Sequence, residues 1–577
     1  MRIIKIYIEG IFLYLLITNL FSQKFQFAIL GDRTGGADQK VFEKIIEEIS
    51  KNNLDFVINV GDLIEGYIGD ENLINARWDT ILNTIKKLPC PFYFVPGNND
   101  IWNEKSREIY IKRTNSKTYY SFDYGNVHFI IIDNSIINGW EEIDTLQLNW
   151  IKKDLSNTEK EIIFCFFHKP FWINAVREKK TDIIHEILKT KKKVYVISGH
   201  LHVFTKTSID NIKYLVAGSS GGSIGGNEAL GEFYGYTLVS VENGNINVKF
   251  IKIDGEIVPD NALNFEEREK LLKIQKEYVN IEPIIMIEGK RFKKSEIKVK
   301  IKNILEEDFT STFKWNFDEK IWKISPQEYT YTFKKNKLST LKFKLINTSY
   351  EKIFPLPFFE FVYPRKGWGE YRISNSLKLI RQVNIKKTRM APKIDGKINE
   401  NCWKVKIDKL YGNEGKITKV EPTEIYFTYD ENNFYIGIKC IQKIGEIKSK
   451  VKERDNSEII GDDCVILYFD VNVFDPFVHQ IIVNPEGIIF DQLIEFKEEH
   501  TKRNKSWNGD WKVSTGKEKY EWIVEISIPF DMFGKKIEKG TKWRFNIARI
   551  EQSAQDIATW QPIISIDPNY FGIILFE

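Results

Sequence analysis

The segment Phe25-Gln-Phe-Ala-Ile-Leu-Gly-Asp32 is an apolar run of strand length that ends abruptly in a carboxylate. Four later runs in the first half of the chain have the same form, because each precedes a polar side chain able to bind a metal ion. They are residues 56–60 before Asp62, residues 92–95 before Asn98, residues 162–167 before His168, and residues 194–198 before His200 and His202. Near-continuous apolar runs are typical of strands buried under helices on both faces. The five runs therefore predict an α/β domain.

Helical patterns between these runs support the same fold class. Apolar residues recur at helical spacing in residues 41–50, 78–88, 145–155 and 181–190. In an open α/β sheet, ligands gather at the carboxyl ends of the strands, so the five polar ends should converge on one crevice. Carboxylate, amide and imidazole ligands suit Mn, Fe or Zn and differ from a thiolate site. A single Gly-Asp is usually a turn and a single buried His is usually structural, so this prediction depends on the ordered set of five.

The order of these motifs carries a family resemblance. Gly31-Asp32, Gly61-Asp62, Gly97-Asn98-Asn99-Asp100, His168 and Gly199-His200-Leu201-His202 resemble the motifs of the calcineurin-like metallophosphoesterase superfamily. The resemblance covers about residues 24–254 and implies two β-sheets flanked by helices. It also implies two divalent metal ions (Mn, Fe or Zn) and hydrolysis of a phosphomonoester or phosphodiester by a metal-activated hydroxide.

The same resemblance implies a role for each ligand position. Asp62 would bridge the two metals, and Asp32 and His202 would bind one of them. The other metal would be bound by Asn98, His168 and His200.

Two positions depart from the family pattern. Thr34 stands where the family commonly has a His, so the first metal would lack one imidazole, and Glu65 or Tyr67 is a candidate to replace it. Asn99 stands where many members have a His that protonates the leaving group or steadies the phosphate. An Asn side chain donates a hydrogen bond but delivers no proton at neutral pH. We therefore expect a rate that depends strongly on the pKa of the leaving group.

The predicted catalytic residues are Asn98, Asn99 and Arg33. Arg33 and Lys169 lie beside ligand positions in the sequence and could clamp phosphate oxygens. The alternative for both cations is an ordinary solvated surface charge.

The remainder of the chain is predicted to be rich in strands. We expect a catalytic domain at residues 23–254, a helical connector at 255–282, a β-sandwich resembling immunoglobulin-like spacers at 283–363, and a linker at 364–386. Residues 387–577 open with Pro392-Lys-Ile-Asp-Gly-Lys-Ile-Asn-Glu-Asn-Cys-Trp403 and resemble carbohydrate-binding modules of family 9. Trp560 is the candidate for stacking on a sugar, and a purely structural β-sandwich is the alternative.

Composition and the N-terminus indicate the compartment and the partners. Residues 1–22 resemble a secretory signal peptide, because Arg2 and Lys5 precede a short apolar run, which predicts a secreted or periplasmic protein without a transmembrane segment. The 84 Lys and Arg residues against 80 Asp and Glu leave a net charge of +4, which argues against nucleic-acid binding by bulk charge. Phe, Trp and Tyr make up 14% of the chain, as expected for β-sandwich cores, sugar-binding surfaces or both.

Together these features predict a secreted, metal-dependent phosphoesterase with an appended glycan-binding module. The alternative is a non-catalytic surface or glycan-binding protein that carries a degenerate metallophosphoesterase site. A third possibility is an adhesin in which the β-sandwiches matter most.

Overall fold

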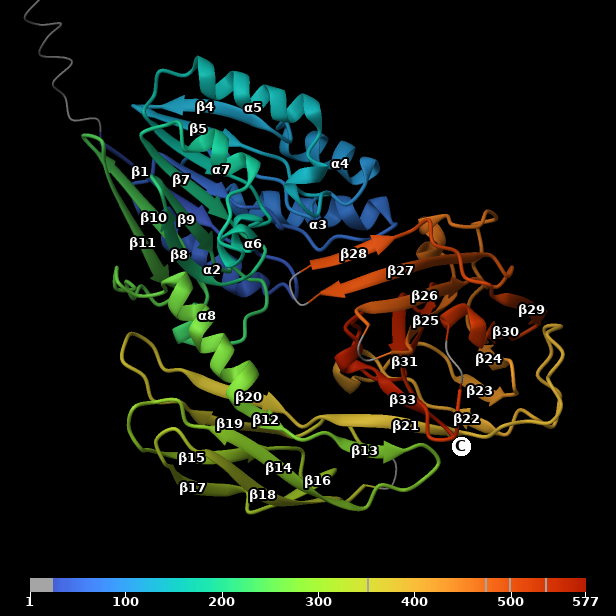
Figure 1. Ribbon diagram of the computed structural model, residues 1–577. Helices are drawn as coiled ribbons and strands as arrows, with labels where there is room; N and C mark the ends of the chain where they lie inside the picture. The colour runs from blue at the N-terminus through green and yellow to red at the C-terminus, as the bar shows by residue number, and fades with distance from the viewer. Residues whose placement is uncertain (1–23, 350–351, 473–474, 498–499, 535–536) are drawn as a thin grey trace, which may run out of the picture. The chain divides into compact units, whose positions relative to one another are not determined.

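The computed structural model describes residues 24–349, 352–472, 475–497, 500–534 and 537–577 (Figure 1). The predicted signal peptide, residues 1–22, lies outside the described residues. The chain forms two compact units. The first runs to Lys276 and includes Val362–Arg372, and the second comprises Glu277–Phe361 and Ile373–Glu577.

The first unit contains two sheets. The five-stranded sheet has the order β11 (Asn245–Lys252), β10 (Gly235–Glu242), β1 (Lys24–Leu30), β2 (Phe56–Asn59) and β3 (Phe92–Tyr93). The six-stranded sheet has the order β4 (Tyr120–Tyr124), β5 (Val127–Ile131), β6 (Ile162–Phe166), β7 (Lys193–Ser198), β9 (Ile212–Ala217) and β8 (Phe204–Ile209).

The strands that precede the predicted site are parallel within each sheet. β1 pairs parallel with β2, and β2 with β3. In the other sheet β5, β6, β7 and β9 are all parallel neighbours. The carboxyl ends of β1, β2 and β3 therefore share one edge, as do those of β6 and β7.

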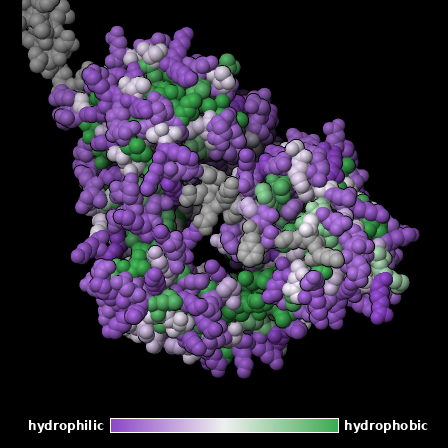
Figure 2. Space-filling model, in the orientation of Figure 1, coloured by the Kyte–Doolittle hydropathy of each residue, from purple (hydrophilic) through white to green (hydrophobic). Residues whose placement is uncertain are grey.

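Aromatic side chains fill the space between the two sheets. Phe27 of β1 stacks on Phe56 of β2 with ring centroids 4.7 Å apart, and Phe129 of β5 stacks on Phe164 of β6 at 5.5 Å. Across the layer, Phe27 meets Phe129 edge to face at 5.4 Å. Most of the aromatic content here is core, and the face of the molecule drawn in Figure 2 is largely hydrophilic.

Helices cover the outer faces of both sheets (Figure 1). The outer layers consist of α2 (Gln39–Ser50), α3 (Glu71–Ile85) and α4 (Glu104–Thr114) on the first sheet, and α5 (Thr145–Asn157), α6 (Trp172–Arg177) and α7 (Ile183–Leu188) on the second. The α2 helix begins where the Asp38 carboxylate accepts hydrogen bonds from the Lys40 and Val41 amides. Its apolar residues Ile45 and Ile49 then point into the core. The predicted α/β domain is therefore present, with a further helix, α8 (Phe265–Lys273), at its end.

The second unit begins with two four-stranded sheets. One has the order β12 (Val279–Ile281), β14 (Lys294–Lys302), β18 (Leu338–Asn347) and β16 (Trp322–Ser325). The other has the order β17 (Glu328–Phe333), β15 (Phe309–Asn316), β19 (Phe358–Val362) and β20 (Arg372–Ser376). Trp315 and Phe343, one from each sheet, meet edge to face at 5.6 Å, so the two sheets pack together.

The rest of the second unit contains two larger sheets that share one apolar core. The first has the order β13 (Ile284–Ile287), β21 (Leu379–Ile385), β33 (Gly572–Phe576), β31 (Lys542–Glu551), β25 (Cys464–Asp470), β26 (Phe477–Val483), β27 (Ile489–Lys497) and β28 (His500–Asn504), with β32 (Asp556–Thr559) beside β31. The second has the order β22 (Val405–Ile407), β23 (Thr423–Tyr429), β24 (Asn433–Ile441), β30 (Glu521–Pro529) and β29 (Lys512–Glu518).

The segment 364–386 differs from the linker that the sequence predicts. Its second half forms β20, which joins the sheet of β15 and β19, and β21, which pairs parallel with β33. Strand pairing therefore joins the two β-rich parts through consecutive strands. All five cysteines are free thiols. Among the described residues, no helix is both long and apolar enough to cross a membrane.

Candidate metal centre

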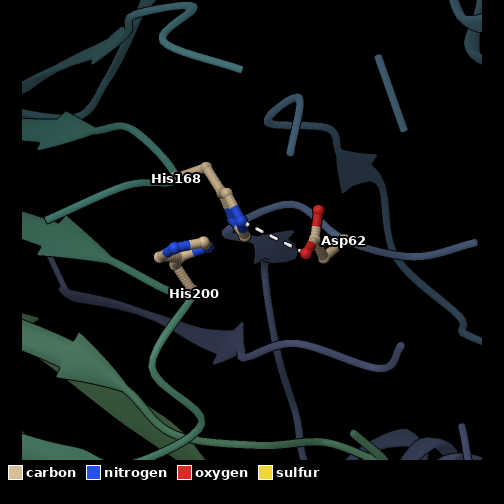
Figure 3. Close-up of side chains that lie close together, drawn as sticks. All are labelled: Asp62, His168 and His200. Carbon is tan, nitrogen blue, oxygen red and sulfur yellow. Dashed lines mark ion pairs between the residues drawn. The ribbon is translucent and has the colours of Figure 1, made fainter. Parts of the chain in front are cut away.

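Three side chains from neighbouring strand ends form the centre of the site. Asp62 follows β2, His168 follows β6 and His200 follows β7, and each offers a ligand atom within 4.8 Å of the others (Figure 3). The Nε2 atom of His168 lies 3.3 Å from Oδ2 of Asp62. A carboxylate and two imidazoles are ligands that suit a divalent transition metal.

The other predicted ligands lie around this centre. His202 Nε2 is 3.4 Å from Oδ2 of Asp32, and the same carboxylate oxygen is 4.0 Å from His168 Nε2. The Asn98 side-chain oxygen lies 3.1 Å from His168 Nε2. The fold thus brings together all six residues that the sequence proposes as metal ligands.

Two imidazoles are oriented by backbone carbonyls. His168 Nδ1 lies 2.8 Å from the Val60 carbonyl oxygen, and His202 Nδ1 lies 2.8 Å from the Ser223 carbonyl oxygen. A carbonyl only accepts, so Nδ1 carries a hydrogen in each ring and Nε2 faces the carboxylates. Metal-binding histidines are commonly oriented in this way by a partner outside the coordination sphere.

Two of the glycines that precede proposed ligands are required because a carboxylate of the site lies close to their backbone. A Cβ atom at Gly97 would lie 2.2 Å from Oδ1 of Asp62, and one at Gly199 would lie 2.4 Å from Oδ1 of Asp32. Any other residue at these positions would displace a carboxylate of the site. Backbone strain also gathers here, because Asp62, His200 and His202 all have positive φ values, of 58°, 72° and 54°. Strain of this kind costs about 1–3 kcal/mol per residue and clusters at functional sites.

The electrostatics of the site favour a bound cation. Burial alone would raise the pKa of Asp62, but His168 and hydrogen bonds from Asn99 outweigh it and lower the pKa to about 2. Burial would likewise lower the pKa of His168, but Asp62 and Asp32 raise it to about 9. Either a protonated His168 or a metal cation can therefore offset the negative charge of Asp62 and Asp32. Metal binding should accordingly release the proton of His168. Burial and His168 lower the pKa of His200 to about 3, which leaves that imidazole neutral.

Asn99 holds the proposed bridging carboxylate in place. Its backbone N–H donates to Oδ1 of Asp62 at 2.8 Å, and its side-chain amide donates to Oδ2 at 2.7 Å. The side-chain oxygen of Asn99 accepts from the Gly66 amide at 3.3 Å. Asn99 is therefore a positioning residue in this arrangement.

Asp100 is a site residue to which the sequence assigned no role. Its buried carboxylate accepts hydrogen bonds from four backbone N–H groups, those of Asp62, Leu63, Ile64 and Gly97, at 2.7–3.2 Å. It thereby ties the loop after β2 to the loop after β3. The available sequence signal is its place directly after two Asn residues in Gly97-Asn98-Asn99-Asp100.

The two cations proposed as phosphate clamps are both engaged elsewhere. Arg33 is 8% exposed, and its guanidinium donates to the Leu63 carbonyl at 3.3 Å and to Gln39 at 2.7 Å. This arrangement corrects the prediction of a catalytic Arg33, because the side chain is committed within the protein. Lys169 donates through Nζ to the Ile137 carbonyl at 2.8 Å.

Glu65 and Tyr67, the candidates to replace the imidazole that the family commonly has at the position of Thr34, also have other partners. Thr34 is fully buried after β1. The Glu65 carboxylate accepts from the Gly36 and Ala37 amides at 3.1 and 3.0 Å, so it orders the loop that follows Thr34. The Tyr67 hydroxyl accepts from the Asn98 side-chain amide at 3.3 Å and thus lies beside one proposed ligand.

Trp560, predicted to stack on a sugar, is fully buried. Its indole N–H donates to Glu288 at 3.0 Å, and its ring packs against Phe545 and the Arg381 guanidinium. The prediction of a sugar contact is therefore wrong, because no face of the ring is accessible. Trp560 thereby connects Glu288, which follows β13, to the core that the two larger sheets share.

Comparison with known proteins agrees with the site. Residues 25–204 match the family model described as calcineurin-like phosphoesterase, which confirms the resemblance for this part of the chain. A probable glycerophosphodiester phosphodiesterase of Arcobacter nitrofigilis is 26% identical over 188 residues, which are 29% of this chain and 65% of that protein. Purple acid phosphatase 15 of Arabidopsis thaliana is 23% identical over 154 residues, which are 23% of this chain and 28% of that protein. The chain thus spans less than two thirds of the length of these relatives.

The chain also has a likeness among solved structures. A carbohydrate binding module of family 9 from Caldicellulosiruptor kristjanssonii, solved in complex with cellotriose, is 16% identical with a TM-score of 0.25. The match covers 34% of this chain and 93% of that module.

Proposed function

We propose that the first unit hydrolyses phosphate esters, monoesters or diesters, with the help of two divalent metal ions. The observation that supports this best is the convergence of Asp32, Asp62, Asn98, His168, His200 and His202 from five strand ends, with the Nε2 atoms of His168 and His202 directed at carboxylates. Such a donor set fits Mn, Fe or Zn.

Each residue then has a defined task. Asp62 would be shared by the two ions, with Asp32 and His202 holding one of them and Asn98, His168 and His200 holding the other. When bound, two divalent ions lower the pKa of a water molecule and offset charge on the phosphoryl group. Asn99 and Asp100 keep the Asp62 carboxylate and its loop in position.

The chemistry of the leaving group follows from Asn99. No imidazole stands at this position, and both polar atoms of the amide are engaged by Asp62 and Gly66. The protein thus supplies no proton from here to the departing oxygen. We expect the rate of the chemical step to fall steeply as the pKa of the leaving group rises across a series of aryl phosphates and their diesters, and a flat dependence would contradict this role for Asn99.

Metal analysis combined with a rate assay tests the proposal. The purified protein should contain two divalent ions and hydrolyse p-nitrophenyl phosphate or bis-p-nitrophenyl phosphate. Asp62→Ala should abolish activity, whereas Asp260→Ala, at an exposed position, serves as the matched control and should not. A protein that stays metal-free and inactive after loading with Mn or Zn would instead favour the non-catalytic binding protein.

We also propose that the C-terminal part binds a glycan, at a different aromatic residue from Trp560. Trp507 is partly exposed and meets His479 and Trp511 edge to face at 5.2 and 6.0 Å. The neighbouring Asn508 accepts from Arg454, whose guanidinium also donates to Asp491 at 2.9 Å. An aromatic ring beside a polar network is the combination that sugar recognition requires.

Binding of the full chain to insoluble polysaccharides checks this second proposal. Trp507→Ala should remove the chain from the bound fraction. Tyr520→Ala changes an aromatic residue that is 50% exposed elsewhere in the same unit, and it should leave binding intact. Equal retention of both variants would contradict a glycan site at Trp507.

Export of the protein is the last part of the proposal. It is supported by the apolar run at residues 11–20 that follows Arg2 and Lys5. Mass spectrometry of the protein expressed from its full reading frame should find a new N-terminus close to Gln23, and an intact Met1 in the cell interior would contradict export.

A further inference from the structure

A cavity of about 570 Å³ opens directly beside the candidate metal centre. His200 and Asn98, two of the proposed ligands, form part of its lining, together with Tyr67. A volume of this size accommodates a small organic molecule. The alcohol part of an ester bound at the metal centre would therefore extend into this cavity.

The opposite wall is formed by two helices, and it is both apolar and cationic. Helix α6 and the residues just before it contribute Phe171, Ile173 and Arg177, and helix α8 contributes Arg268 and Leu272. Lys169 adds a third cation, and among the residues that the structure describes no acidic side chain lines the cavity. The sequence predicted α8 only as a connector, but here it completes a wall of the catalytic unit.

The two arginines are held in place by fixed contacts. Arg177 forms a bidentate pair with Glu269, at 2.9 and 3.1 Å. Arg268 donates through Nε to the Leu230 carbonyl at 3.2 Å, and its NH1 lies 3.5 Å from the same Glu269. Glu269 thus faces two guanidiniums, and Glu232 is a second carboxylate whose charge acts on Arg268. The cavity lining itself holds three cations, Lys169, Arg177 and Arg268, so this wall remains cationic. The side chain of Arg268 is only 13% exposed, so water screens its charge weakly.

From this arrangement we propose that the enzyme's preferred substrates are phosphate esters whose alcohol part is apolar and carries a second anionic group, a carboxylate or a second phosphate. The inference rests on the proposed phosphoesterase function and specifies its substrate class. The phosphoryl group occupies the metal centre, the apolar body packs against Phe171 and Leu272, and the second anion pairs with Arg268 and Arg177. Arginine favours both carboxylate and phosphate because its planar fork donates two parallel hydrogen bonds.

A matched pair of ligands isolates this contact. 4-Carboxybenzylphosphonate and its methyl carboxylate ester differ in one negative charge, and neither can be hydrolysed. With Mn-loaded full-length protein, calorimetric titration should show about tenfold tighter binding of the acid, as expected for one charge-assisted pair. Arg268→Gln and Arg177→Gln should remove this preference and leave binding of the ester unchanged, which also shows that the variants are folded. Arg268→Lys should restore part of it.

Lys270→Gln is the matched control, because it removes an exposed charge from the same helix and should retain the full preference. Equal binding of the two ligands by the unaltered protein, or a preference that persists in both arginine variants, would overturn the inference. 4-Carboxybenzylphosphonate is also compared with 1,4-phenylene bisphosphonate. Tighter binding of the carboxylate ligand indicates a site for a carboxylate, and tighter binding of the bisphosphonate indicates a site for a phosphate.

Rate measurements separate this inference from the proposed function. The same comparison with 4-carboxyphenyl phosphate and its methyl ester should show the preference for the acid in KM, whereas a difference in kcat should follow the pKa values of the two phenols. If both phosphates are hydrolysed without any preference, the substrate class is wrong and the phosphoesterase stands. If neither is hydrolysed but the phosphonates show the preference, the pocket binds as proposed and the enzyme assignment fails.

Discussion

At Asp100, one buried carboxylate holds two loops of the candidate metal centre together through four backbone N–H groups. Replacing it by Asn turns one accepting oxygen into a donor that faces other donors. An unsatisfied buried N–H costs about 1–3 kcal/mol. We therefore expect Asp100→Asn to lower the free energy of unfolding of the first unit by about 2–3 kcal/mol and to reduce kcat at least tenfold, because Asp62 loses its fixed backbone.

Urea denaturation and the p-nitrophenyl phosphate assay measure the two effects of Asp100→Asn. Asp260→Asn is the control, since it makes the same chemical change at an exposed carboxylate. Stability and kcat that both match the control would show that Asp100 does not organise the site.

The residue-level predictions from sequence succeeded and failed for identifiable reasons. The ligand positions could be predicted because a residue that directly follows a buried parallel strand has little choice of location. Arg33 also follows such a strand, but its long side chain turns back toward Gln39 and Leu63, which no local pattern encodes. Trp560 could not be placed because a Trp in a strand-rich region is equally compatible with a core and with a surface. Its burial depends on Glu288, which is 272 positions away.

At the scale of elements, His128 fastens helix α5 to the six-stranded sheet. Its ring nitrogens lie 2.7 Å from Asp123 of β4 and 2.8 Å from Asp154 of α5. Burial alone would lower the pKa of His128, but the hydrogen bonds to Asp154 and Asp123 outweigh it and raise the pKa above its usual value. These contacts are those of a structural histidine.

The raised pKa of His128 predicts a pH-dependent contribution to stability. A group whose pKa is raised by folding stabilises fully below its unfolded pKa of about 6.5, and this contribution disappears as the pH rises through the folded pKa. His128→Gln should therefore cost about 2 kcal/mol at about pH 5.5 and clearly less at about pH 9. Asp123 is half-exposed, so Asp154 should supply most of the effect. Denaturation curves at the two pH values test this, and a cost that grew with pH would contradict it.

Helix α8 depends on a segment that returns from far along the chain. The buried Tyr371 donates through its hydroxyl to the Leu271 carbonyl at 2.5 Å, and Arg365 pairs with Glu267. Tyr371→Phe removes only the hydroxyl and should lower the free energy of unfolding of the first unit by about 1 kcal/mol. Its thermal unfolding is compared with that of Tyr329→Phe, at an exposed site outside this segment. A loss no larger than in the control would mean that the returning segment does not support α8.

Some elements could not be predicted because their partners are distant. Helix α4 buries little apolar surface, mainly Ile109 and Tyr110, so its sequence lacks a strong apolar stripe. It begins instead with a capping box between Asn103 and Ser106. This polar signal does not show in the spacing of apolar residues. The strand β21 has its partner β33 at the end of the chain, and a five- or seven-residue strand carries no local sign of such a pairing.

At the scale of the whole molecule, the division into two compact units predicts that a metal stabilises only one of them. All six proposed ligands belong to the first unit, and the second has its own core. Ligand at about 100 times its Kd stabilises a native state by about 2.7 kcal/mol, which raises the Tm of a unit of this size by about 5 °C. Calorimetry should therefore show that Mn or Zn moves one unfolding transition upward and leaves the other in place.

Asp62→Asn separates specific from non-specific metal effects in this calorimetric experiment. The variant keeps the shape of the side chain but offers no second anionic oxygen to bridge two ions, so the metal-dependent shift should shrink or vanish. The shift in the unaltered protein should also be smaller at about pH 5.5 than at about pH 8, because metal and proton compete for His168. Chelation by EDTA should reverse it. A shift of both transitions, or an equal shift in Asp62→Asn, would place the stabilising ions outside the cluster of strand ends and would remove the main support for a two-metal centre there.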